Sequence, residues 1–140
     1  MNNTISIAKT IKSFNKKLEI EGDKSLSIRW SLLASQAIGK STAQNILLSE
    51  DVLSTLKCLK KLSVKIKLIK NKCIIHGVGI NGYKYKKNII LNVGNSGTLG
   101  RLISGLLIHS KKQIKLVGDR SLSKRDFLRI IKPLKKFGAK

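Results

Sequence analysis

The sequence predicts an α/β chain built from repeated βαβαββ units, and three observations support this prediction. Short segments in which apolar and polar residues alternate are separated by longer segments with apolar residues every three or four positions, so strands alternate with helices. The order strand, helix, strand, helix, strand, strand is complete near His76 and then begins again. A length of 140 residues with 41% hydrophobic residues suffices for a real core.

The first unit is predicted from alternation and from helix-end signals. Gly39 is a stop signal for the first helix. Ser49 can cap the second helix, with Glu50 and Asp51 in its first turn, where the helix dipole favours anions. The predicted elements are strands at 5–7 and 18–20, a helix at 25–38, an extended segment at 41–48, a helix after Ser49, and strands at 64–68 and 73–76.

The second unit repeats this order but stops early. Pro133 lies inside its last helical pattern, where a kink or an early end is expected. Two more strands should follow, so we interpret the second copy as incomplete and expect this chain to be a fragment. The predicted elements are a strand at 88–93, a tight turn at 94–97, a helix at 98–109, a strand at 113–117 and a helix at 125–137.

Composition restricts the class of function. The chain has 29 Lys and Arg against 7 Asp and Glu, a net charge of +22. Such a charge suits phosphate partners, but with 24 Lys, only 5 Arg and few aromatic residues for stacking, nucleic acid is the alternative rather than the expected partner. No apolar run approaches a membrane span and no secretory signal is recognisable, so we expect a cytoplasmic protein without membrane contact.

The cysteines and histidines predict neither a disulfide framework nor a metal site. Two cysteines, Cys58 and Cys73, suit a reducing cytosol as small hydrophobic residues. No pairing of these cysteines with His76 or His109 has the spacing of metal ligands. We therefore expect neither a metal nor another cofactor.

Three turns share the composition of anion sites. The segments 22–29 and 94–101 each run from a glycine into a helix, with a Ser or Thr in the first turn and an Arg three or four residues later. The segment 118–125 is a third basic turn before a helix. Free N–H groups and the helix dipole attract anions at such places. The three turns predict one cleft for a small ligand with several negative charges.

Four motifs, three of them in these turns, resemble the 3-phosphoshikimate 1-carboxyvinyltransferase (EPSP synthase) family, in the family's order and from about Gly22 to the end of the chain. The resemblance implies transfer of the enolpyruvyl group of phosphoenolpyruvate to the 5-hydroxyl of shikimate 3-phosphate, through a tetrahedral intermediate and without a metal. The motifs are Gly22-Asp-Lys-Ser-Leu-Ser-Ile-Arg29, Asn45-Ile-Leu-Leu-Ser-Glu-Asp51, Gly94-Asn-Ser-Gly-Thr98 with Arg101, and Gly118-Asp-Arg-Ser-Leu with Arg125.

The resemblance assigns the first turn to both substrates. Lys24 matches a catalytic family residue that touches both shikimate 3-phosphate and phosphoenolpyruvate, where its charge can stabilise the phosphate-bearing intermediate. Ser25 and Arg29 match positions that bind shikimate 3-phosphate.

The other two turns are assigned to phosphoenolpyruvate. Gly97 matches a position where a side chain would crowd this ligand, and Arg125 matches an arginine that binds it. Asn95, Thr98 and Arg101 are expected to shape and support the turn.

Family members have two similar domains of three βαβαββ units each and are much longer than this chain. By this resemblance, residues 1–21 are N-terminal strands that pack with the other domain, and residues 22–140 are the first part of the N-terminal-half domain. The missing C-terminal part would be the partner and supply the acidic residue and further cations. The full-length enzyme is expected to be a monomer, and this chain alone is expected to be inactive and poorly soluble.

Two departures and two alternatives accompany this interpretation. Trp30 replaces a small residue and Asp126 replaces a proline, so the first helix could be crowded and the third turn loosened. The related transferase that acts on UDP-N-acetylglucosamine normally carries Lys-Asn in the first turn, where this chain has Lys24-Ser25. Residues 34–41 imitate a phosphate-binding P-loop, but a helical pattern precedes the glycine and no helix begins after it.

Overall fold

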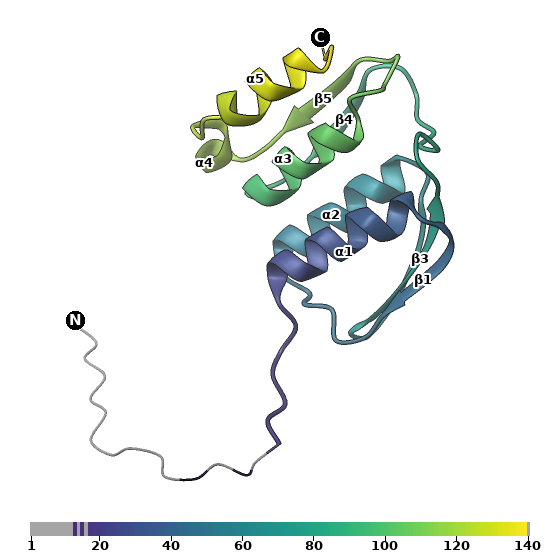
Figure 1. Cartoon of the computed structure of the whole chain (residues 1–140), viewed down its shortest axis with the longest axis vertical. Helices are drawn as coiled ribbons and strands as arrows, with labels where there is room; N and C mark the ends of the chain where they lie inside the picture. The colour runs from purple at the N-terminus through teal and green to yellow at the C-terminus, as the bar shows by residue number, and fades with distance from the viewer. Residues whose placement is uncertain (1–12, 14, 16, 140) are drawn as a thin grey trace, which may run out of the picture.

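The computed structural model describes residues 13, 15 and 17–139, which form two consecutive α/β units (Figure 1). The mixed α/β prediction is therefore confirmed. The first unit contains α1 (Lys24–Gln36), β1 (Ile38–Ala43), α2 (Glu50–Lys61), β2 (Lys65–Ile69) and β3 (Lys72–Val78). The second contains β4 (Ile89–Asn92), α3 (Gly97–Leu106), β5 (Ile114–Val117), α4 (Arg120–Ser123) and α5 (Leu128–Lys136).

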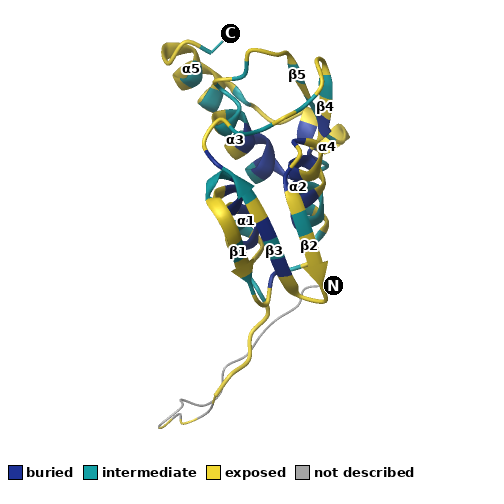
Figure 2. Cartoon of the chain, turned by 90° about the vertical axis from the view of Figure 1, so that its right-hand side faces the viewer, coloured by how far each residue is buried: buried dark blue, intermediate teal, exposed yellow. Residues whose placement is uncertain are grey.

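The first unit is a three-stranded antiparallel sheet against two helices. The strand order is β1-β3-β2, with Ile75 of the central strand opposite both Ser41 and Ile66. Ile75 and Cys73 are buried, because alternate residues of β3 face the helices, while exposed His76 faces away. Figure 2 shows the three strands lying across the helices. This sheet fixes the positions of α1 and α2, which carry the first turn of the site.

The second unit places two turns at one sheet edge. Strands β4 and β5 are parallel, with Asn92 opposite Val117, and α3 is the crossover between them. The carboxyl ends of parallel strands meet at the same edge, so the segments that follow them are neighbours. The Asp119 N–H accordingly donates to the Gly94 carbonyl at 3.0 Å. The predicted turns at 94–97 and 118–125 are thus adjacent.

The helices form a layer whose N-terminal ends face one side. In Figure 1, α1, α2 and α3 lie side by side and all run from left to right. Their packing is apolar, with Ile28, Leu59 and Ile103 all fully buried. The layer therefore presents several helix N-termini to the same edge, which is the arrangement that an anion site uses.

Three predicted boundaries were wrong. Residues 18–20 form no strand in the described chain. The first helix ends at Gln36, and Gly39, with a φ of 92°, lies inside β1 instead of stopping the helix. Pairing of Ile38 with Val78 replaces the helical hydrogen bonds at this point, so tertiary pairing overrides the helical pattern. The extended segment predicted at 41–48 ends at Ala43. The predicted strand at 5–7 lies outside the described residues.

The predicted helix at 125–137 begins three residues later than expected, at Leu128, and a separate short helix, α4, lies within the predicted turn at 118–125. Asp119 caps α4 by accepting from the Leu122 N–H at 2.6 Å, and Asp126 accepts from the Leu128 N–H at 2.6 Å where α5 begins. These side-chain bonds satisfy backbone donors at two separate helix starts. Asp126 therefore gives its turn a hydrogen bond that a proline could not supply. Pro133 is tolerated inside α5.

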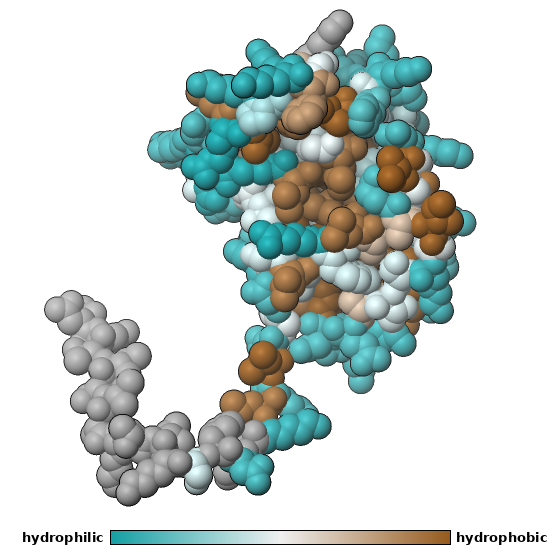
Figure 3. Space-filling view, viewed as in Figure 1, coloured by the Kyte–Doolittle hydropathy of each residue, from teal (hydrophilic) through white to brown (hydrophobic). Residues whose placement is uncertain are grey.

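An apolar face of the helix layer is exposed in the described chain. Leu26 and Leu33 of α1 are 65% and 69% exposed, and partly buried Trp30 lies between them in sequence. Figure 3 shows hydrophobic side chains across the middle of the face that the helices occupy. Among the described helices, none is both long and apolar enough to cross a membrane.

Candidate anion-binding site

The first turn of the site is a capped helix start. Asp23 is the N-cap of α1, and its carboxylate accepts from the Leu26 N–H at 2.6 Å. Gly22 is required just before the cap, because a Cβ there would lie 2.1 Å from the Asn45 carbonyl oxygen. This close approach places Lys24 in the first turn of α1, at the positive end of the helix dipole.

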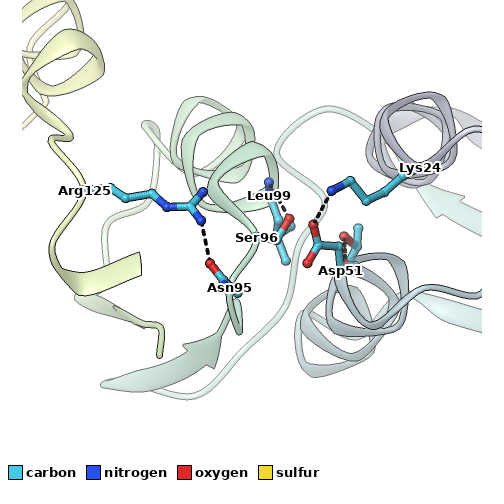
Figure 4. Close-up of polar contacts among 7 residues, drawn as sticks. Lys24, Asp51, Asn95, Ser96, Leu99 and Arg125 are labelled. Atoms are coloured by element: carbon cyan, nitrogen blue, oxygen red, sulfur yellow. Dashed lines mark hydrogen bonds and ion pairs between the residues drawn. The ribbon is translucent and has the colours of Figure 1, made fainter. Parts of the chain in front are cut away.

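Lys24 is paired with a carboxylate that sequence reasoning did not assign to the site. Its Nζ lies 3.3 Å from Oδ2 of Asp51, which belongs to the first turn of α2 (Figure 4). The Lys24 side chain is 51% exposed and that of Asp51 is 20% exposed. An ion pair so accessible to water is weak, so an incoming anion can compete for the ammonium group. The signals available for Asp51 were its place in the acidic first turn of α2 and its place at the end of the 45–51 motif.

Ser25 and Arg29 lie on the same side of α1, four residues apart. Ser25 is partly buried and Arg29 is exposed. In the described part of the chain, Arg29 forms no ion pair, so its guanidinium remains available for a ligand. These two residues share the N-terminal half of α1 with Lys24.

The second turn packs two guanidinium groups against a buried glycine. A Cβ on Gly97 would lie 3.0 Å from Nη1 of Arg125 and 3.2 Å from Nη1 of Arg101. Nη2 of Arg125 donates to the Asn95 side-chain oxygen at 2.7 Å (Figure 4). Ser96 is the N-cap of α3, with its hydroxyl oxygen accepting from the Leu99 N–H. The turn thus exposes a helix N-terminus beside two cations.

The supporting residues of this turn have distinct surroundings. Thr98 is partly buried in the first turn of α3. The Arg101 guanidinium lies 5.4 Å from the centre of the Phe127 ring, a cation–π contact. Phe127 was not singled out by sequence reasoning, because its contact with Arg101 joins residues far apart in the chain.

The first and second turns are connected through α2. The Ser54 hydroxyl would lie 3.2 Å from a Cβ on Gly94, and Ser54 follows Asp51 by three residues on the same helix. The structure brings Arg125, Asn95, Gly97 and Arg101 into one cluster. Lys24 is paired with Asp51 on α2, the helix whose Ser54 borders Gly94.

The electrostatics of this edge favour anions. The helices α1 and α3 both begin here, beside Lys24, Arg101 and Arg125. Among the described residues, Asp51 is the one carboxylate that forms an ion pair with a cation. A ligand with a phosphate and a carboxylate would find both backbone donors and side-chain cations within this edge.

Other potential sites are not supported by the geometry. Within the described chain, no three His, Cys, Asp or Glu residues gather in a way that could hold a metal ion. Burial raises the pKa of the Cys58 thiol to about 11, so it is a poor nucleophile. Residues 38–43, which include the glycine, lysine and serine of the P-loop imitation, form strand β1. The P-loop needs a helix at this place, so this alternative was wrong.

Known proteins match the chain over nearly its full length. The family model for EPSP synthase (3-phosphoshikimate 1-carboxyvinyltransferase) matches residues 8–140. A 3-phosphoshikimate 1-carboxyvinyltransferase of Ruthia magnifica subsp. Calyptogena magnifica is 45% identical over 133 residues, which are 95% of this chain and 30% of that protein. The protein of that name from Bacillus subtilis (strain 168) is 38% identical over 130 residues, 93% of this chain and 30% of its own length.

A solved structure agrees with the sequence relatives. The EPSP synthase from Acinetobacter baumannii superposes with a TM-score of 0.83 at 40% identity, over 89% of this chain and 28% of that one. This chain spans about 30% of the length of the curated relatives that it matches. With the family model covering residues 8–140, the chain belongs to the EPSP synthase family.

Proposed function

We propose that this chain contributes one wall of a site that transfers the enolpyruvyl group of phosphoenolpyruvate to shikimate 3-phosphate. The observation that carries this proposal is the convergence of helix N-termini with Lys24 and Arg125 at one edge of the fold. Both substrates are small anions with phosphate groups, and this edge offers dipoles and cations for them. Family membership supports the same activity.

The reaction places a demand on Lys24. The shikimate 5-hydroxyl gives its proton to a base as its oxygen bonds to the central carbon of phosphoenolpyruvate and the methylene carbon takes a proton, which gives a tetrahedral adduct. That methyl group then loses a proton as the carbon–oxygen bond to phosphate breaks, so inorganic phosphate leaves and the enol ether remains. Lys24 supplies a positive charge beside the negatively charged phosphate group of this adduct. Asp51 holds the ammonium until the substrates displace it.

The remaining residues divide between the two substrates. Ser25 and Arg29, on one side of α1, bind shikimate 3-phosphate, because a hydroxyl and a guanidinium suit a phosphate group. Arg125 binds phosphoenolpyruvate, and Gly97 leaves the necessary space beside the guanidinium. Asn95 fixes the direction of Arg125 through the 2.7 Å hydrogen bond, and Thr98 and Arg101 support the same turn.

The opposite wall would come from sequence that this chain does not span. The chain matches about 30% of the curated relatives' length, so a family-length enzyme has room for a second set of substrate contacts. We propose that this remainder supplies the acidic group that acts on the shikimate hydroxyl. The exposed apolar residues Leu26 and Leu33 are suited to covering by further protein. Residues 22–140 would then be the first part of the N-terminal-half domain of a cytoplasmic enzyme.

A titration separates this proposal from nucleic-acid binding. Shikimate 3-phosphate should bind this chain weakly, and Arg29→Ala should lower the affinity about tenfold or more, because a charge-assisted hydrogen bond is lost. Arg129→Ala removes the same side chain from an exposed position on α5 and should change nothing. Both variants should bind duplex DNA with equal affinity, and this affinity should fall steeply as salt rises.

The DNA arm also defines the contrary outcome. Tight DNA binding at physiological salt, together with no Arg29-dependent signal from shikimate 3-phosphate, would overturn the proposed function. It would favour a role for the +22 net charge spread over the surface.

A further inference from the structure

Arg101 has an unusual environment for a cation. Its Nε is buried and has no hydrogen-bond partner in the described chain. Its Nη1 points to the same place beside Gly97 as Nη1 of Arg125, so two guanidinium groups of like charge lie close together. No described carboxylate forms an ion pair with either of them. Something other than charge pairing must hold Arg101 in this arrangement.

The Phe127 ring provides that contact. The Arg101 guanidinium carbon lies 5.4 Å from the ring centre, and a Cβ on Gly100 would lie 3.3 Å from the ring edge. The ring is therefore enclosed between the backbone of α3 and the Arg101 side chain. Phe127 is also the N-cap of α5, and its carbonyl accepts from the Ile130 and Ile131 N–H groups. The ring thus ties the start of α5 to the first turns of α3.

This contact bears on Arg125, which lies two residues before Phe127. Arg125 is exposed and reaches back to Asn95 across the gap between two segments. A long exposed side chain has many rotamers, and one hydrogen bond does not restrict them strongly. The backbone from which Arg125 extends is held in place by the Phe127 ring, the next apolar residue along the chain.

We propose that Arg101 is a positioning residue for Arg125 and acts through Phe127. The cation–π contact clamps the segment 125–127 against α3, so that the Arg125 guanidinium stays between Asn95 and Gly97. The consequence for phosphoenolpyruvate rests on the proposed function, whereas the clamp itself does not.

The clamp can be tested without any ligand. In NMR spectra of the full 140-residue chain, a guanidinium held by a hydrogen bond gives a sharp, displaced Arg125 side-chain signal. Arg101→Gln removes the cation and Phe127→Met removes the ring while filling its space. Both should move the Arg125 signal to the averaged position of a free arginine. Arg101→Lys and Phe127→Tyr keep the cation and the ring, and they should restore most of the displacement.

A remote cation–π pair supplies the control. Lys112 lies 5.7 Å from the centre of the Tyr85 ring, on the far side of α3 from the turn. Lys112→Gln removes a positive charge and a cation–π contact without touching the segment 125–127. It should leave the Arg125 signal unchanged. Backbone amide spectra of each variant report whether the chain is folded, and Arg101→Gln keeps the test available if Phe127→Met does not fold.

Phosphoenolpyruvate then measures the consequence. Arg101→Gln and Phe127→Met should each weaken its binding about fivefold, and the double variant should be no weaker than the worse single variant, because both break one clamp. An unchanged Arg125 signal in Arg101→Gln, or losses that multiply in the double variant, would overturn the proposal. A clamp that behaves as expected in a chain that does not bind phosphoenolpyruvate would instead contradict the proposed function alone.

Discussion

The two cationic turns of this fold hold their charges in different ways. At the start of α1, the Lys24 ammonium faces the Asp51 carboxylate at 3.3 Å, and both side chains are accessible to water. At the start of α3, the Arg125 guanidinium lies against the buried backbone of Gly97 and donates to a neutral amide of Asn95. The first turn balances charge with charge, whereas the second relies on close packing.

This difference predicts different behaviour. The exposed ion pair is screened by salt and competes with any incoming anion, so the first turn should respond to ligand and to ionic strength. The second turn is held by close packing at Gly97, by the Arg125–Asn95 hydrogen bond and by the cation–π contact of Arg101, without a pair of opposite charges, so it should be formed before ligand arrives. The following changes test this contrast, from the largest expected effect to the smallest.

Gly118→Ala should break the packed turn. An added Cβ would lie 2.4 Å from Leu122 and 2.8 Å from the Gly94 carbonyl oxygen, and the backbone cannot yield cheaply. We expect a loss of about 1–3 kcal/mol in the free energy of unfolding, measured by urea denaturation. Gly105→Ala is the matched control, because open space surrounds Gly105 in α3 and alanine favours a helix. Equal stability of both variants would contradict the packed turn.

Lys24→Ala should disable binding at the first turn while leaving the fold intact. Loss of a charge-assisted contact should weaken phosphoenolpyruvate binding about tenfold or more in a calorimetric titration. The free energy of unfolding should change by less than about 1 kcal/mol, because exposed ion pairs contribute little. Lys67→Ala, at an exposed position of β2, controls for net charge. If the two lysine variants bind equally, Lys24 has no special role.

Asp51→Asn should free Lys24 for other anions. Removal of the competing carboxylate should raise the affinity for inorganic phosphate about threefold at low salt, and the gain should fade at high salt. Glu50→Gln removes the neighbouring carboxylate, which forms no ion pair in the described chain, and should have a smaller effect. A lower phosphate affinity in Asp51→Asn would mean that Asp51 orients Lys24 for binding rather than competing with the ligand.

The smallest effect concerns the strand end beneath the second turn. The Cys58 thiol donates to the Asn92 carbonyl, and burial raises its pKa from 9.0 to about 11. As pH rises from 9.0 towards 11, the unfolded thiol ionises while the folded one stays neutral, so stability should fall in this window. In Cys58→Val the urea midpoint should fall less over the same pH range. The other titrating groups are common to both proteins, so their effects cancel in this comparison. Identical pH profiles of the urea midpoint in the two proteins would indicate that the Cys58 thiol is accessible to water in the folded chain.

Local signals in the sequence predicted most of what is local in the structure. The periodicity of α2 and α3, the alternation of β2 and the glycine turns before α1 and α3 all depend on neighbouring residues. The turns before α1 and α3 were therefore recognisable, whereas their binding of anions stays a prediction. Both ends of the first helix were predicted to within two residues, but Gly39, which was expected to stop the helix, lies in β1.

Contacts between distant residues were not predictable in this way. The Lys24–Asp51 pair requires α1 and α2 to begin at the same edge, which only the packing on the sheet determines. The Arg101–Phe127 contact likewise depends on how α5 returns to α3. The short helix α4 was missed, and its start depends on Asp119, whose side chain accepts a hydrogen bond from the Leu122 N–H within the segment predicted as a turn.

The account's central claim is that the two turns form one anion site. Titration of phosphoenolpyruvate into the chain, followed by NMR, tests it through two independent reporters, the Lys24 ammonium and the Arg125 guanidinium. The account predicts that both signals shift with one dissociation constant and that Lys24→Ala weakens the Arg125 response by the same factor as overall binding. Two different dissociation constants, or an Arg125 response indifferent to Lys24→Ala, would show that the turns bind anions separately and would contradict a shared site.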